Sequence, residues 1–207
     1  KKAKRTHHPP EKLNRYIFLK MKRIKTGIAF VLFFIGLTHA HAQYEIKAEA
    51  GYSPQIGTMV DMLEDLKGRI EELTRDLTQA ETDYLFDGDA NSIGALIMHL
   101  AATEAYYQVE TLEGRSWTDE EAVVWMVGGE LNEKTREQLK GKPIAYYLEL
   151  WDEVRKKTLQ GLKAKDDAWF AADADEGINN HYVWYHVLEH SANHMGQIAL
   201  VKNRLPE

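Results

Sequence analysis

Residues 186–198 read HVLEHSANHMGQI and place two histidines where a helix of this chain needs apolar side chains. At about 100° per residue, His190 and His194 project close to the direction of Val183 and Val201, in the centre of an apolar stripe. Two adjacent imidazoles buried without partners are unfavourable, whereas a shared metal ion satisfies both and suits the i, i+4 spacing. The pattern therefore indicates either a metal site or two core histidines hydrogen-bonded to backbone or tyrosine groups.

Four long segments of the chain repeat apolar residues at spacings of three and four, which predicts four helices. They span about residues 59–77, 93–112, 143–165 and 180–204. Residues 119–139 begin with a capping-box signature, and Gly128-Gly129 is expected to divide this stretch into two short helices. The connection between the second and third long helices is about 30 residues, and no β-alternation or internal repeat is evident. The sequence predicts an all-α four-helix bundle with a long crossover between helices two and three.

The first 42 residues are expected to lie outside this bundle. Residues 1–20 precede the first methionine and are interpreted as upstream or added sequence. Residues 21–42 combine a basic start, an apolar segment of 11 residues and an A-x-A cleavage signal, which is typical of a secretory signal peptide. Cleavage after Ala42 predicts an exported, periplasmic protein without a stable membrane anchor, because the apolar segment is too short to span a bilayer. Residues 43–57 then form a lead-in, and 58–207 a single domain.

The part of the chain after the predicted leader is strongly acidic. Residues 43–207 keep 16 of the 26 Lys and Arg but 31 of the 32 Asp and Glu, a formal charge of about −15. A charge of this sign argues against nucleic acid or an anionic membrane surface as a partner. The chain has no cysteine, so any metal must be held by nitrogen and oxygen ligands.

Two segments of the sequence together resemble the DinB-like superfamily. One is SIGALIMHL, residues 92–100, which contains His99 on the predicted second helix, and the other is HVLEHSANHMGQI, residues 186–198. The resemblance covers roughly residues 58–205 and implies a four-helix bundle of DinB/YfiT-like topology. It also implies that His99, His190 and His194 bind a divalent metal, often zinc or nickel, in a cleft. Characterised relatives include S-transferases that use bacillithiol or mycothiol and an isomerase of maleylpyruvate.

Three neutral nitrogen ligands that leave one position open are typical of a reactive metal site. Such an ion lowers the pKa of its water or of a bound thiol, which predicts a metal-dependent hydrolase or S-transferase acting on a small-molecule substrate. Low-molecular-weight thiols are mainly cytosolic, so hydrolysis is the simpler reaction for an exported protein. The alternatives are a non-catalytic metal-binding or stress-associated module, and a structural bundle whose histidines bind nothing. Related bundles often form homodimers, although no surface pattern in this sequence requires one.

Further residues are candidates for roles beside the histidines. Glu104 lies on the apolar stripe of the second helix, where it suits a further ligand, an acceptor for an imidazole N–H, a general base, or a groove-edge glutamate that reaches water. Gln197 shares the face of His194 and can orient water in catalysis, or can instead pack or cap a loop. His186 lies about 40° further round the helix, which predicts a supporting or surface position. Four aromatic residues either line a substrate cleft or take part in ordinary packing: Tyr106, Tyr107, Trp184 and Tyr185.

Overall fold

The computed structural model describes residues 45–206 of the chain. The predicted upstream segment 1–20 and the predicted leader 21–42 lie outside the described residues, so cleavage after Ala42 stays a prediction. Within the described part, every helix is too short or too polar to traverse a lipid bilayer. The described residues are mainly helical, with one short antiparallel hairpin.

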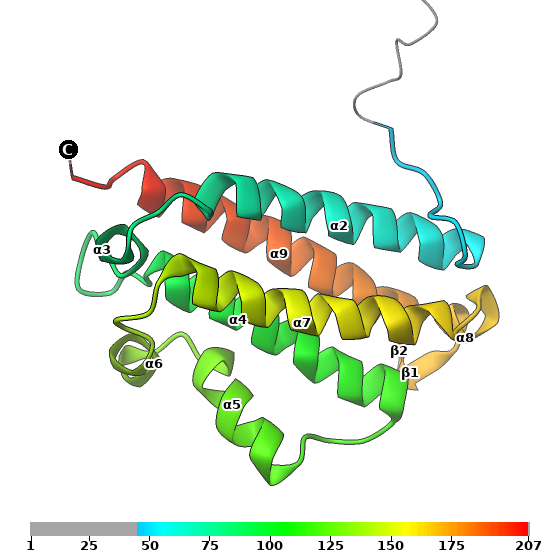
Figure 1. Cartoon of the computed structure of the whole chain (residues 1–207). Helices are drawn as coiled ribbons and strands as arrows, with labels where there is room; N and C mark the ends of the chain where they lie inside the picture. The colour runs from blue at the N-terminus through cyan, green and yellow to red at the C-terminus, as the bar shows by residue number, and fades with distance from the viewer. Residues whose placement is uncertain (1–44, 207) are drawn as a thin grey trace, which may run out of the picture. The chain divides into compact units, whose positions relative to one another are not determined.

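Four long helices build the bundle: α2 (Pro54–Thr74), α4 (Ile93–Tyr107), α7 (Ile144–Lys163) and α9 (Asn180–Lys202). Helix α4 packs against α7 and α9, and α2 packs against the same two helices (Figure 1). The first and second bundle helices are therefore diagonal to each other. Helices α4 and α7 are neighbours that run in the same direction (Figure 1), so the chain must return along the bundle between them, which explains the long crossover. The predicted all-α helical bundle is confirmed.

The crossover between α4 and α7 carries short helices of its own. Helix α4 continues into a π-helix, η1 (Gln108–Glu113), which ends at Gly114 with a φ of 65°. Helices α5 (Asp119–Gly129) and α6 (Glu133–Gln138) follow, so the predicted division at the glycine pair is confirmed. Helix α5 packs along α4 and covers one of its faces (Figure 1).

Four short elements were not expected from the periodicity: α3 (Gln79–Thr82), α8 (Asp167–Ala171), β1 (Asp173–Asp175) and β2 (Ile178–Asn179). The strands form a hairpin in an acidic stretch, although no β-alternation is evident in the sequence. Gly177 supplies the turn, with a φ of 74° that favours glycine. Helix α2 also begins at Pro54, before the predicted domain boundary at residue 58, because proline is favoured in the first turn of a helix.

The core of the bundle buries most of α4 but leaves two of its side chains partly exposed. Two apolar clusters, one around Trp151 and the other around Trp184, exclude water from the interior, so Trp184 packs in the core and does not line a cleft. Every residue from 92 to 105 is buried except His99 and Thr103, which are four residues apart. These two side chains therefore lie one turn apart on the same face of α4, at its partly exposed edge.

Helix α5 lies very close to α4 at Gly128. A Cβ at this position would lie 2.8 Å from both the carbonyl oxygen and Cγ of Met98. We expect Gly128→Ala to lower the free energy of unfolding by about 1–3 kcal/mol through overpacking. The neighbouring Gly129→Ala is the control, because its Cβ meets nothing within 4 Å. Urea titration of both variants measures the difference, and equal effects would contradict a close approach at Gly128.

Candidate metal centre

Three imidazoles from two helices meet at the partly exposed edge of α4. The ring centroid of His99 lies 4.9 Å from that of His190 and 4.9 Å from that of His194. The rings of His190 and His194 are 4.4 Å apart. One nitrogen from each of the three lies within 4.8 Å of the others. The structure therefore brings together the three histidines that the sequence places in distant segments.

Hydrogen bonds set the tautomer of two of these histidines. His99 Nδ1 donates to the carbonyl oxygen of Gly128 at 2.8 Å. His194 Nδ1 donates to Oε1 of Gln197 at 3.0 Å. Since both acceptors are carbonyl oxygens, Nδ1 carries the proton in each neutral ring and Nε2 keeps a free lone pair. This is the arrangement that metal-binding histidines generally have.

The donor set fits a divalent cation such as zinc or nickel, for which imidazole nitrogen is a good ligand. A tetrahedral zinc ion holds its nitrogen ligands about 3.3 Å apart, so the three rings must close slightly to grip an ion. His190 Nε2 is 3.5 Å from the hydroxyl of Thr103, the outer limit of a hydrogen bond. Its ring is therefore weakly held and can turn toward an ion.

Burial keeps the three imidazoles in the neutral form that coordinates metals. Loss of solvation is the main reason that the pKa of His190 is lowered to about 4, and the neighbouring His194 and His99 lower it further. Burial also lowers the pKa values of His99 and His194, against the opposing effect of their hydrogen bonds to Gly128 and Gln197. Protons therefore compete with a cation only below the usual titration range of histidine.

These pKa values predict acid sensitivity of the metal-free protein. The pKa of His190 is 6.5 in the unfolded chain and about 4 in the folded one, so the unfolded state binds more protons between these values. The contribution of His190 to stability is thus present above pH 6.5 and is lost as the pH falls toward 4. Urea unfolding at a series of pH values measures this loss. His190→Gln does not titrate and should show a shallower slope, and identical slopes would contradict the assignment.

Glu104 is not part of this cluster. Its carboxylate is 1% exposed and lies between α4 and α7, where Arg155 donates to it at 2.8 and 2.9 Å. Trp151 and Thr158 donate to the same carboxylate at 2.9 and 2.6 Å. The interpretation of Glu104 as a water-facing glutamate is therefore wrong, because the apolar stripe of α4 turns it into the core. Its recorded contacts also give no support to a role as ligand, imidazole acceptor or general base.

His186 lies beside the cluster rather than within it. Its ring centroid is 5.5 Å from that of His190 and 5.9 Å from that of Tyr107. Nδ1 of His186 is 3.7 Å from the carboxylate of Glu189 on the same helix. The side chain therefore links the three imidazoles to the lining of a neighbouring cavity, to which His186 and Tyr107 both belong.

Two cavities adjoin the histidine cluster and share the side chains of Tyr106 and Tyr107. The smaller, of about 260 Å³, includes Thr103 and Trp117, and the larger, of about 390 Å³, includes His186. Each cavity thus contains a neighbour of His190. The indole N–H of Trp117 is buried and has no hydrogen-bond partner among the described residues. No sequence motif predicted that Thr103 and Trp117 line the smaller cavity, because they come together only when α5 packs against α4.

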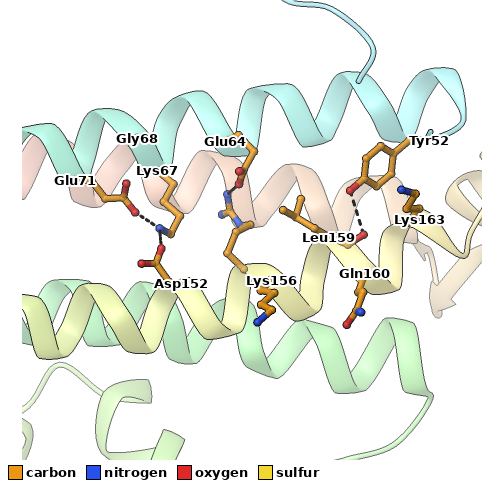
Figure 2. A pocket seen from close by; sticks show the side chains of 11 residues that line it. Tyr52, Glu64, Lys67, Gly68, Glu71, Asp152, Lys156, Leu159, Gln160 and Lys163 are labelled. Atoms are coloured by element: carbon orange, nitrogen blue, oxygen red, sulfur yellow. Dashed lines mark hydrogen bonds and ion pairs between the residues drawn. The ribbon is translucent and has the colours of Figure 1, made fainter. Parts of the chain in front are cut away.

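A larger cavity, of about 570 Å³, lies between α2 and α7 on the opposite side of the bundle (Figure 2). Its polar side chains largely satisfy one another. Lys67 pairs with Glu71 and Asp152, and the hydroxyl of Tyr52 donates to the carbonyl oxygen of Leu159 at 3.2 Å (Figure 2). No histidine within residues 45–206 lines this cavity. The three candidate metal ligands instead lie on α4 and α9.

Comparison with known proteins adds one finding. A family model described as mycothiol-S-transferase matches residues 58–206, which include His99, His190 and His194. No curated protein matches the chain. The matched segment covers almost all of the described bundle. The chain therefore belongs to the mycothiol-S-transferase family, within the DinB/YfiT-like metal-binding superfamily.

Proposed function

We propose that this protein is a divalent-metal-dependent S-transferase that joins a low-molecular-weight thiol to a small electrophilic molecule. The observation that carries this proposal is the convergence of His99, His190 and His194 beside two adjoining cavities. Family membership favours a thiol over water as the nucleophile. A reaction between two substrates needs space for both, and the paired cavities supply it.

Each group of the site has a part in this reaction. His99, His190 and His194 would hold the cation, while Gly128 and Gln197 keep two of the rings in the correct tautomer. When bound, a divalent cation lowers the pKa of a coordinated thiol and so supplies a nucleophile at neutral pH. The thiol proton passes to solvent, a bond forms between sulfur and the electrophilic carbon, and the leaving group departs with its electron pair. Tyrosine rings from the shared wall of the cavities exclude water from the reacting atoms.

Metal dependence of thiol conjugation is the direct test. Chelator-stripped protein and protein reloaded with zinc or nickel are compared with monochlorobimane as the electrophile and with mycothiol, bacillithiol, glutathione or cysteine as the thiol. We expect conjugate fluorescence to depend on the metal for at least one thiol. A parallel panel of esters tests hydrolysis. Equal turnover by stripped and loaded protein in both panels would contradict a metal-dependent enzyme.

A non-catalytic metal-binding module is the alternative, and the coordination shell distinguishes it. Cobalt in a site with an open position changes its visible absorption when a thiol is added, whereas a closed site does not.

We also propose export with cleavage after Ala42, which the mass of the secreted chain tests. In an exported protein, the thiol must reach the same compartment.

The contact between Gln197 and His194 predicts an effect on metal affinity. We expect Gln197→Ala to weaken zinc binding about 10-fold, because His194 loses the acceptor that fixes its ring. The side chain of Gln197 is exposed, so the free energy of unfolding should change little. Competition with a chromophoric chelator measures the affinity, and Asn193→Ala, also exposed on α9, is the control. Unchanged affinity in Gln197→Ala would mean that this hydrogen bond does not position the ring.

A further inference from the structure

The larger cavity beside the histidines combines aromatic rings with carboxylates. Its volume of about 390 Å³ is in the range of a small-molecule site. Tyr106, Tyr107 and Tyr182 contribute rings, and Glu110 and Asp175 contribute carboxylates. None of the described residues that line it is a lysine or an arginine. The cavity is therefore aromatic and negatively charged.

No cationic side chain among residues 45–206 pairs with the two carboxylates, since the ion pairs there include neither Glu110 nor Asp175. Asp175 Oδ1 accepts the backbone N–H of Glu176 at 2.7 Å, and Glu110 is hydrogen-bonded to the Tyr106 hydroxyl, so neither contact is with a cation. Burial is the main reason that the pKa of the Tyr106 hydroxyl is raised, and the negative charges of Glu110 and Asp175 raise it further. Both carboxylates therefore lie close enough to influence a group in the wall of the cavity. Asp175 lies on the β1–β2 hairpin, close in sequence to two further acidic residues outside the cavity lining, Asp173 and Glu176. An anion entering this cavity would be repelled, and a cation attracted.

The aromatic rings complete the recognition of a particular kind of cation. The rings of Tyr106 and Tyr107 meet edge to face, with centroids 5.2 Å apart, and Tyr182 is 55% exposed on α9. Tyrosine faces beside carboxylates bind organic ammonium groups through cation–π attraction together with direct charge attraction. A hydrated inorganic ion gains less from aromatic walls. We propose that this cavity binds the ammonium group of a small organic cation with an apolar body.

The position of the cavity connects such a ligand to the candidate metal centre. His186 lines the cavity, and its ring centroid is 5.5 Å from that of His190. The shared wall of Tyr106 and Tyr107 leads into the smaller cavity, which contains Thr103. An ammonium group held by Glu110 and Asp175 therefore leaves the apolar body pointing toward the histidines. The organic cation is the electrophilic acceptor of the transfer reaction, and this assignment rests on the proposed function.

Calorimetric titration of metal-stripped protein tests the binding site separately from the reaction. The probes are benzyltrimethylammonium, neutral benzyl alcohol and anionic benzoate. We expect benzyltrimethylammonium to bind at least 10-fold more tightly than either of the others. The double variant Glu110→Gln/Asp175→Asn should lose at least 10-fold in affinity for the cation. Asp173→Asn/Glu176→Gln removes the same charge near the hairpin turn outside the cavity and should change the affinity less than 3-fold.

A second pair of variants tests the aromatic contribution. Tyr182→Leu should weaken binding of the cation at least 3-fold, whereas Tyr146→Leu, which alters an exposed tyrosine on α7 outside the lining, should leave the affinity unchanged. Equal affinity for the three probes, or equal losses in the two double variants, overturns the cation site. Cation binding that persists in protein without any thiol-transfer activity supports the site and contradicts the proposed function. Thiol transfer without preferential binding of the cation supports the proposed function and contradicts the cation site.

Discussion

Alanine substitution of His190 is expected to reduce the bound metal from about one ion per chain to none, and thiol transfer at least 100-fold. His190 is one corner of a nearly equilateral group of imidazoles, with its ring centroid 4.9 Å from that of His99 and 4.4 Å from that of His194. The remaining two nitrogens come from different helices and hold an ion weakly once the third is lost. Elemental analysis of zinc-loaded protein after gel filtration measures the stoichiometry.

Two other histidines of α9 provide matched controls for this result. His186→Ala removes a ring one turn away, and His181→Ala removes an exposed ring that stacks on Phe170 with centroids 4.4 Å apart. Both variants should retain the full metal content. His99→Ala should lose the metal as His190→Ala does, although its side chain comes from α4. Unchanged metal in His190→Ala, with its helical circular dichroism intact, would falsify the three-histidine centre.

The second large effect is on stability, at the buried pair of Arg155 and Glu104. We expect Arg155→Ala to lower the free energy of unfolding by about 3–5 kcal/mol, because Glu104 is left charged in the core without its partner. Burial opposes ionisation of Glu104 most strongly, yet the charge and hydrogen bonds of Arg155, with those of Thr158 and Trp151, keep its pKa below the usual value. Arg155 also donates to the carbonyl oxygen of Leu63 at 2.7 Å, so it joins α2, α4 and α7.

Two comparisons separate this buried pair from ordinary surface charges. Arg155→Lys keeps the charge but loses the planar fork, so it should be destabilised less than Arg155→Ala. Arg69→Ala removes an ion pair of 3.6 Å between Arg69, which is 57% exposed, and Asp65, which is 62% exposed. This variant should lower the free energy of unfolding by less than about 1 kcal/mol. Guanidinium titrations followed by tryptophan fluorescence measure all three. A loss below about 1 kcal/mol for Arg155→Ala would mean that water reaches Glu104 when the arginine is removed.

Periodicity predicted the bundle because long helices bury a continuous apolar face. The four bundle helices and the division at Gly128-Gly129 followed from spacing and from glycine alone. The π-helix at residues 108–113 did not, since its backbone widening depends on tertiary contacts such as the 2.6 Å hydrogen bond that Gln108 donates to Thr158. The hairpin and α8 were missed for the same reason, because such short elements depend on their neighbours.

The sequence predicted those features of the candidate site that depend on the direction of a side chain on its own helix. It did not predict those that depend on contacts between helices. The inward direction of His190 and His194 followed from their phase on α9. By contrast, the acceptor of His99 is a backbone carbonyl on α5, which no residue type in the sequence can signal. Glu104 lies on the apolar stripe of α4, but its partner could not be predicted, because Arg155 lies 51 residues away on another helix.

The separation of the three histidines along the chain has a consequence for folding. His99 and His190 are 91 residues apart in the sequence, with the whole crossover and α7 between them. A cation held by both would act as a reversible cross-link that closes this loop in the native state alone. The melting temperature would then rise with the free concentration of the ion, since only the native chain presents the complete set of ligands. Cellular supply of the ion would in this way regulate how long each molecule survives.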